Sequence, residues 1–364
     1  MYAGRTVAVV VKAYNEERQI RLVLDGMPDF VDRIVVVNDG SKDATAKVVA
    51  GYIKRGCSTE TAIHRVNRQV GDSPYNYALK VVAEMREREA EFYPRSNVVN
   101  ENVTDRIVLI DQENSGAGGA VATGYRWCRE HGIDCTAVVD GDGQMDPAEL
   151  ESIVVPIVLD GVDYAKGNRL IHPASFVVIP KVRFFGNSVL SLLTKIASGY
   201  WSVSDTQTGY TAISLEALER IPLHKIYRSY GYPNDILVKL NMANCTIREV
   251  PIKPVYRIGE QSKMKILKVV PRVSWLLFKS FFKRIFWKYL VRDFHPLSLF
   301  YFFGIGLGVV NLGFFAKIFN DVILKGGSVT HGIYTAFMLF SLFSFQLIGF
   351  AMWMDIQDNQ RLYK

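Results

Sequence analysis

The chain has 364 residues, enough for one large or two small domains, and 49% of them are hydrophobic, as in an ordinary globular protein. A net charge of +7 is compatible with an anionic partner, either a membrane surface or nucleic acid. The four cysteines show no Cys-x-x-Cys spacing, which indicates neither a zinc site nor a disulfide framework and fits reduced thiols.

Four short β-branched runs, each followed by a polar motif and a predicted helix, form the first half of the chain. They are residues 6–11, 34–37, 107–110 and 136–139. Strands that alternate with helices predict right-handed βαβ units and a mostly parallel α/β sheet with helices on both faces. Ligands of such sheets bind at the carboxyl ends of the strands, where all four polar motifs lie. We therefore expect the motifs to form one site.

The polar motif at residues 140–147 brings two carboxylates and an amide together. In an extended segment every second residue shares a face, so Asp140, Asp142 and Gln144 can converge. Oxygen ligands of this kind hold Mg²⁺ or Mn²⁺, usually together with the phosphates of a substrate. We expect a divalent metal bound against a pyrophosphate. A turn without a ligand is the alternative interpretation, because Asp-Gly and Asp-Pro are common in tight turns.

Residues 57–104 interrupt the alternation of strands and helices. Residues 81–90 predict an exposed helix, and the rest of the segment is polar with few apolar anchors. We interpret this insert as a surface flap, in the simplest case a solvated excursion. A lid and a contact within a homo-oligomer are the alternatives.

The composition changes after about residue 256. Residues 297–318 carry one charge and residues 333–354 carry none, and each run is close to the roughly 20 residues needed to cross a bilayer. Lysine and arginine crowd into residues 263–292 between aromatic residues, which predicts one or two amphipathic helices in the headgroup layer. The positive-inside rule places this side in the cytoplasm. We attribute the net charge to an anionic membrane surface rather than nucleic acid. Core helices of a soluble protein are the alternative.

Seven motifs, covering nearly all of residues 6–265, resemble those of a family 2 glycosyltransferase of GT-A fold, specifically the dolichyl- or undecaprenyl-phosphate sugar synthases. In chain order they are Ala13-Tyr14-Asn15-Glu16; Asp39-Gly40-Ser41 with Asp43 and Thr45; Asn114 with Gly116, Gly118 and Ala120; Asp140-x-Asp142-x-Gln144; Gly167-Asn168-Arg169; Asp205-x-Gln207-x-Gly209-Tyr210; and Arg257-x-x-Gly259-x-x-Ser262-Lys263.

The resemblance implies a division of the chain into three parts. A cytoplasmic GT-A catalytic domain spans residues 1–256, with the insert at about 57–104. Juxtamembrane basic amphipathic helices span residues 257–296. A two-helix transmembrane hairpin and a short cytoplasmic tail span residues 297–364.

The donor site is the first set of residues that the resemblance implies. Ala13 to Glu16, with Asp39, resemble the pocket for the nucleotide base and ribose. Asp140, Asp142 and Gln144 resemble the metal and diphosphate site, with Asp142 as the most direct ligand. The residues expected to contact the donor are Ala13, Tyr14, Asn15, Glu16, Asp39, Asn114, Gly116, Asp140, Gly141, Asp142 and Arg169.

The second set of residues is expected to bind the donor and acceptor phosphates and to take part in catalysis. Arg169, Arg257 and Lys263 resemble cations that hold the donor diphosphate and the acceptor phosphate, and Ser262 joins them at the acceptor. Solvated surface or headgroup contact is the alternative. Asp205 stands where related enzymes with hydroxyl acceptors keep a catalytic base, and a helix cap is its alternative. The predicted catalytic residues are Asp140, Asp142, Asp205 and Arg257.

Three features depart from the family pattern. Lys12 stands where proline is usual, Asn38 replaces the first aspartate of the usual Asp-Asp-Gly-Ser, and the insert is longer than the common connection. The second departure leaves the base contact of Asp39 open, so the sequence is compatible with both UDP- and GDP-linked sugars.

The implied reaction is attack by a polyprenyl phosphate oxygen on the anomeric carbon of a nucleotide sugar, with inversion. Because the acceptor is already anionic, positioning and charge stabilisation matter more than a strong base. A processive polysaccharide synthase is an alternative, but its Gln-x-x-Arg-Trp motif and several spans do not follow Asp205. A non-catalytic nucleotide-sugar binding protein is another, against which the intact Asp140, Asp142 and Gln144 argue.

Overall fold

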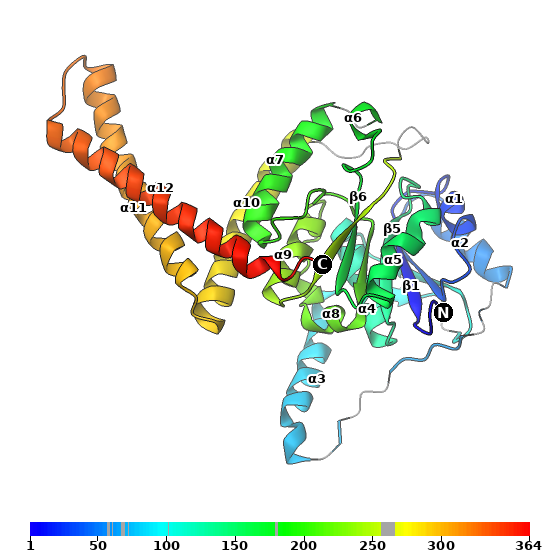
Figure 1. Cartoon of the computed structure of the whole chain (residues 1–364). Coiled ribbons are helices and arrows are strands. Elements are labelled where there is room, and N and C mark those ends of the chain that lie inside the picture. The colour runs from blue at the N-terminus through cyan, green and yellow to red at the C-terminus, as the bar shows by residue number, and fades with distance from the viewer. Residues whose placement is uncertain are drawn as a thin grey trace.

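The structure is a computed structural model that describes residues 1–56, 59, 61–66, 70–71, 73–100, 102–178, 181–255 and 266–364. An eight-stranded sheet enclosed by helices forms the main body, and a long helical hairpin projects from it (Figure 1). The sequence-based prediction of an α/β sheet with helices on both faces, followed by two apolar C-terminal helices, is confirmed.

Four parallel strands form one half of the sheet, in the order β4-β2-β1-β5. They are β1 (Val7–Ala13), β2 (Arg33–Asp39), β4 (Ile107–Gln112) and β5 (Cys135–Asp140). These are the four predicted runs, and each continues at its carboxyl end into the polar motif that follows it. All seven residues of β2 are buried, as expected of a parallel strand covered on both faces.

The other strands make the sheet mixed. Beyond β5 come β7 (Thr211–Ser214), which is antiparallel to both neighbours, then β6 (Tyr164–Asn168) and β8 (Ile247–Pro251). At the opposite edge, β3 (Ser96–Val98) pairs antiparallel with β4. Because β3 belongs to residues 57–104, the end of the predicted insert is an edge strand of the sheet.

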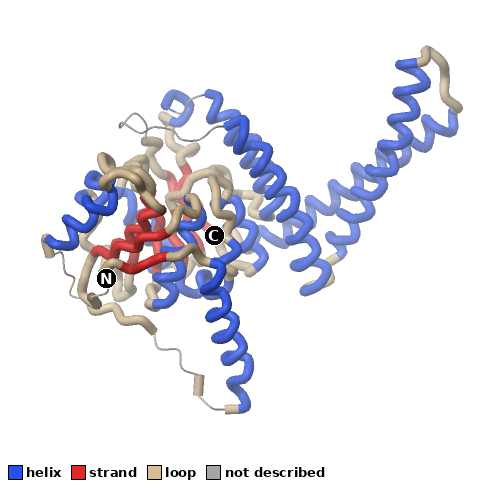
Figure 2. Tube along the Cα trace, turned by 180° about the vertical axis from the view of Figure 1, so that it is seen from behind, coloured by secondary structure: helices blue, strands red, loops and turns tan. Residues whose placement is uncertain are grey.

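Two apolar layers cover the two faces of the sheet, between the strands and the helices that surround them in Figure 2. Successive strand residues point to opposite faces, so Ala8 and Val10 join one layer while Val7, Val9 and Val11 join the other. The first layer includes residues of α4 (Ala117–Glu130), α8 (Leu215–Arg220), 3-10 helix η4 (Leu223–Lys225) and α9 (Tyr232–Met242); the second includes residues of α1 (Ile20–Asp25), α2 (Thr45–Lys54) and α5 (Leu150–Val158), which follows the 3-10 turn η3 (Pro147–Glu149).

The predicted exposed helix of the insert is α3 (Tyr77–Glu89), which extends away from the body and has no buried residue (Figure 1). Short 3-10 turns, η1 (Pro74–Asn76) and η2 (Ala90–Phe92), flank it. The function of the insert stays a prediction.

Helices α6 (Ser175–Val178) and α7 (Lys181–Ser198) precede Asp205, and α10 (Ile266–Arg284) continues into the π-helix η5 (Ile285–Arg292). Buried residues of α7, α9 and α10 form a separate apolar cluster that includes Leu190 and Leu277. Helix α10 is amphipathic, with Val273 buried and Trp275 exposed. One of its faces therefore packs on α7 and α9.

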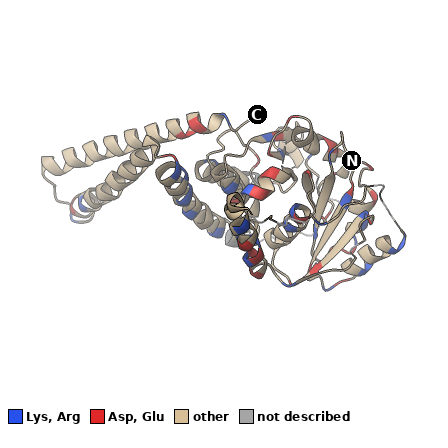
Figure 3. Cartoon of the chain, turned by 90° about the horizontal axis from the view of Figure 1, so that it is seen from below, with Lys and Arg blue, Asp and Glu red and all other residues tan. Residues whose placement is uncertain are grey.

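The projecting hairpin consists of α11 (Pro296–Ile318), extended by the π-helix η6 (Phe319–Leu324), and α12 (His331–Gln360). Residues 296–324 and 331–360 have mean hydropathies of 1.9 and 1.7 and are long and apolar enough to cross a membrane. Figure 3 shows few charges along the hairpin, whereas Lys and Arg residues lie along α10 and η5 beside it.

The end of α12 returns to the catalytic domain through buried polar contacts. Arg284 forms a bidentate ion pair with Asp355 at 2.7 and 2.8 Å. The Lys288 ammonium donates to Asn359 at 2.8 Å and to Asn241 of α9 at 3.0 Å. We call these five residues the α12 cluster. Beyond it, Leu362 joins the core of the catalytic domain, and its carbonyl accepts from the first residue of β8 at 2.7 Å.

Candidate functional site

A pocket of about 740 Å³ opens at the carboxyl ends of the central strands, where the sequence predicts the site. The structure brings together every residue predicted to contact the donor, and Gln144 lines the pocket with them. These residues are Ala13, Tyr14, Asn15, Glu16, Asp39, Asn114, Gly116, Asp140, Gly141, Asp142 and Arg169.

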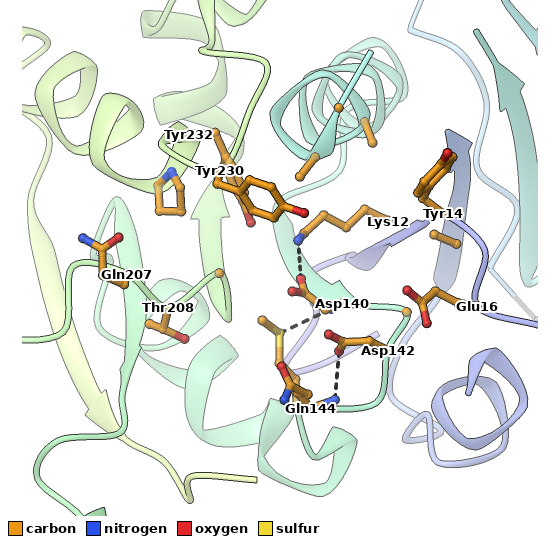
Figure 4. Close-up of a pocket in the computed structure, with 18 of the residues that line it drawn as sticks. Lys12, Tyr14, Glu16, Asp140, Asp142, Gln144, Gln207, Thr208, Tyr230 and Tyr232 are labelled. Atoms are coloured by element: carbon orange, nitrogen blue, oxygen red, sulfur yellow. Dashed lines mark hydrogen bonds and ion pairs between the residues drawn. The ribbon is translucent and has the colours of Figure 1, made fainter. Parts of the chain in front are cut away.

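The carboxylates of Asp140 and Asp142 point into the pocket from the end of β5 (Figure 4). A tight turn follows, with Gly143 at a positive φ of 77°, and the backbone N–H of Gln144 donates to Asp142 at 3.0 Å. On the neighbouring strand, Lys12 stands in register with Asp140, and its ammonium lies 2.7 Å from Oδ1 of that carboxylate. The motif is therefore a turn whose carboxylates face a cavity.

The electrostatics of this cluster favour a cation. Burial and the negative charge of Asp140 together raise the pKa of Asp142 to about 6, because burial and a neighbouring carboxylate both disfavour the ionised form. Burial lowers the pKa of Lys12, but the attraction to Asp140, Tyr232 and Asp142, with the hydrogen bond to Asp140, together outweighs burial and the net shift is upward. Lys12 is therefore an ammonium ion at neutral pH.

The side-chain oxygens of this motif fit a hard divalent cation whose remaining coordination positions are filled by a bound substrate. Asp140 and Asp142 supply two carboxylates and Gln144 an amide, and Mg²⁺ is typically held by one or two carboxylates with substrate phosphates. Oδ1 of Asp140 is buried, and the Lys12 ammonium at 2.7 Å balances its charge. No three His, Cys, Asp or Glu side chains of the described chain gather as a metal centre. The other ligands would have to come from the substrate or water.

The carboxylate of Asp39 organises the far side of the pocket. It accepts hydrogen bonds from Gln112 at 2.6 Å, from the backbone of Ser115 at 2.8 Å and from the backbone of Gly116 at 2.9 Å. Gly116 has a positive φ of 83°, and a Cβ there would lie 2.5 Å from a backbone oxygen of residue 228. Asp39 thus fixes the start of α4, and its contact with a nucleotide base stays a prediction.

Comparison with known proteins identifies the family. The model of glycosyl transferase family 2 matches residues 8–79 and 96–222. The chain belongs to this family. As a family 2 glycosyltransferase, it is an enzyme that transfers sugars.

Two curated relatives act on lipid phosphates according to their names. The UDP-N-acetylglucosamine–dolichyl-phosphate N-acetylglucosaminyltransferase of Methanococcus voltae is 29% identical over 70% of this chain and 87% of its own length. The undecaprenyl-phosphate mannosyltransferase of Micrococcus luteus is 25% identical over 71% of this chain and 87% of its own length. Among solved structures, glucosyl-3-phosphoglycerate synthase from Mycobacterium tuberculosis, in complex with Mn²⁺, UDP and its product, shares 18% identity over 78% of this chain and 80% of that one, with a TM-score of 0.47.

In this glycosyltransferase Asp205 lies behind the pocket rather than on its wall. Its side chain is buried and holds Arg169 through a bidentate ion pair, with N–O distances of 2.8 and 3.0 Å. Burial raises the pKa of Asp205, but the charge and hydrogen bonds of Arg169 outweigh burial and lower it. The prediction that Asp205 is placed like a catalytic base does not match this position, because Arg169 covers it and makes it a weaker base.

The remaining site residues fall into two groups. Arg257, Ser262 and Lys263, predicted for the acceptor phosphate, lie outside the described residues. The second group was not singled out for the pocket from the sequence and supplies much of its wall: Lys12, Gln207, Thr208, Gly209 and the apolar side chains Leu190, Val269, Val270 and Val273.

The valines of the second group have the spacing of a helix face, but the sequence analysis assigned the segment that contains them to the membrane surface. Val269, Val270 and Val273 stand one, three and four residues apart, the spacing of one helix face. Residues 263–292 were predicted to lie in the headgroup layer, yet this face of α10 lines the pocket and packs on α7 and α9. The outward face, with Trp275 and Phe278, keeps the predicted exposure.

Proposed function

We propose that this glycosyltransferase moves a sugar from a nucleoside diphosphate donor to the phosphate of a polyprenyl lipid, with inversion and with the help of Mg²⁺ or Mn²⁺. The observation that carries the proposal is the shared pocket. Asp140 and Asp142 line one side, and α10, which leads through η5 into the two apolar helices, lines another. A donor site and a membrane-proximal helix thus meet in one cavity.

The lipid acceptor is supported by the relatives, whose names give dolichyl phosphate and undecaprenyl phosphate as acceptors. A lipid phosphate is anionic at neutral pH, so its oxygen can attack without a strong base. The chain must then hold two anions together and neutralise the leaving diphosphate. Arg169, on the pocket wall, supplies positive charge for this purpose. Arg257, Ser262 and Lys263 keep their predicted role at the acceptor phosphate.

The metal would be held by Asp140, Asp142 and Gln144, with Asp142 as the most direct ligand. When bound, it supplies Lewis-acid stabilisation of the leaving diphosphate. Asp205 acts as a positioning residue, because its two hydrogen bonds fix the guanidinium plane of Arg169 toward the pocket.

The membrane arrangement follows from charge and hydropathy. Nine basic residues between positions 263 and 292 precede the first apolar helix, so the positive-inside rule places the catalytic domain in the cytoplasm. The exposed face of α10 carries Trp275 and Phe278, and Lys279 lies 5.0 Å from the Trp275 ring centre. Aromatic and basic residues side by side suit the lipid headgroup layer.

The test is a transfer assay with the full chain in detergent and Mg²⁺ or Mn²⁺. Radiolabelled UDP-glucose, UDP-N-acetylglucosamine and GDP-mannose are each offered with dolichyl or undecaprenyl phosphate. We expect one donor to give a lipid carrying a single sugar. Transfer to no lipid phosphate from any donor, or growth of a long glycan on one acceptor, would contradict the proposal.

A further inference from the structure

The ammonium group of Lys12 lies inside the donor pocket, on a carboxylate expected to help bind the metal. Lys12 and Asp140 are register neighbours on the parallel strands β1 and β5, and Nζ is 2.7 Å from Oδ1. The ring of Tyr232 covers the ammonium, with Nζ 5.3 Å from the ring centre. Figure 4 shows the three side chains facing one another. Strand register, rather than a mobile loop, therefore fixes this cation.

A glycine keeps this corner open to a ligand. The hydroxyl of Tyr232, a residue only 5% exposed, faces the Lys12 ammonium. A Cβ on Gly209 would lie 2.5 Å from that hydroxyl and 3.6 Å from Oδ1 of Asp140. The absence of a side chain at Gly209 thus leaves both oxygens room toward the pocket.

We propose that Lys12 is a built-in counter-ion, which holds Asp140 while the donor is absent and contacts the diphosphate when the donor binds, so that the metal binds tightly only together with a nucleoside diphosphate. This inference rests on the proposed function, because it assumes that the pocket takes a nucleotide sugar. It concerns this chain in particular, since the family pattern has an uncharged proline at this position.

The physical reason is charge balance. Asp140 and Asp142 carry two negative charges, and Lys12 cancels one of them. A divalent cation on Asp140 would stand within a few ångströms of the ammonium, and like charges that close repel strongly in a partly buried site. A diphosphate brings the missing negative charge, because it can face the ammonium and the metal at the same time. Metal and nucleotide therefore stabilise each other's binding through Lys12.

The test measures binding of Mn²⁺ to the full chain in detergent by electron paramagnetic resonance, with Mn²⁺ alone, with UDP and with GDP. We expect Lys12→Met to bind Mn²⁺ alone about tenfold tighter than the native protein, because one nearby positive charge is gone. Lys12→Arg, which keeps the charge, should resemble the native protein. Calorimetry in EDTA should show that Lys12→Met weakens the binding of whichever nucleotide the native protein binds.

Asp140→Asn supplies a second readout that does not depend on the folding of Lys12→Met. In the native protein the Lys12 ammonium already pairs with Asp140 and partly neutralises it. Asp140→Asn should therefore change the affinity for Mn²⁺ alone by less than about threefold. In the Lys12→Met variant, adding Asp140→Asn should abolish the tenfold gain in Mn²⁺ affinity. A tenfold loss with Lys12 present, or no gain in Lys12→Met, would overturn the proposal. Absence of sugar transfer would instead overturn the proposed function and leave these affinities unaffected.

Discussion

Two clusters of charged side chains in the described part of the chain differ in how far they are exposed. In the α12 cluster, Arg284 and Asp355 have fully buried side chains, and both guanidinium nitrogens that face the carboxylate are paired with it. In the pocket, the Lys12 and Asp140 side chains also pair with each other but are 15% and 25% exposed, and both line the cavity. The first cluster is closed and joins two parts of the chain, whereas the second is open to a ligand.

Asp142→Asn is the largest expected effect and tests the open cluster. Sugar transfer should fall by about a thousandfold or more, roughly 4 kcal/mol of transition-state stabilisation, because a ligand of the metal is lost. Thermal stability without metal should be kept or raised. The pKa of Asp142 is raised in the fold, so at neutral pH its charge costs stability, and an amide removes that cost. Turnover at the native rate would remove Asp142 from the site.

Asp355→Ala tests the closed cluster. It leaves the buried Arg284 without its partner, which should lower the free energy of unfolding by about 3–5 kcal/mol. Thermal unfolding of the detergent-solubilised protein measures the loss. The double variant Arg284→Met/Asp355→Ala is the control and should recover most of it, because no buried charge is then unpaired. An unchanged melting temperature in the single variant would show that the cluster does not hold α12.

Asp205→Asn tests a residue that shares features of both clusters. Its carboxylate is buried, as in the α12 cluster, but its partner Arg169 lines the pocket. We expect transfer to fall about 10- to 100-fold, mainly through a higher KM for the donor, because Arg169 loses a charged partner. The pKa of Asp205 is lowered, so the carboxylate stays ionised from neutral pH down to below its usual range near 3.9.

The pH profile separates positioning from base catalysis at Asp205. A positioning residue should leave the shape of the profile between about pH 5 and 8 the same in the native protein and in Asp205→Asn. A general base would give an acidic limb that disappears in the variant. That loss would restore the role predicted from the sequence.

Asp160→Ala has the smallest expected effect and serves as the exposed reference for the buried Arg284–Asp355 pair. Asp160 pairs with Arg248 on an exposed part of the surface, and exposed ion pairs contribute roughly 0–1 kcal/mol. The melting temperature and the transfer rate should both stay close to native values. A loss as large as that of Asp355→Ala would mean that burial does not explain the difference between the clusters.

The sequence predicted the parallel half of the fold and brought together most of the residues that line the pocket, because both depend on local patterns. Strands such as β2 are buried on both faces and therefore appear as continuous apolar runs. Their polar motifs follow directly, and the topology of a parallel sheet brings strand ends to one edge. Once the strands were right, the position of Asp142 near Ala13 and Asn114 followed from geometry rather than from any single motif.

The features that were missed depend on partners distant in sequence. Nothing near Asp205 shows that Arg169, 36 residues earlier, will cover it. The strand β7 has four residues and is antiparallel to both neighbours, so it gives no βαβ signal. Asp355 directly follows the apolar run 333–354, and nothing near it indicates that its partner is Arg284, 71 residues away.

The return of the chain after α12 sets an order of assembly. Leu362 completes the apolar layer that also contains Ile247, and Lys364 donates its backbone N–H to the carbonyl of Ile247 at 3.0 Å. Both lie downstream of the two apolar helices. During synthesis this apolar layer can therefore be completed only after both apolar helices have been made, so the α/β body closes with the last residues of the chain.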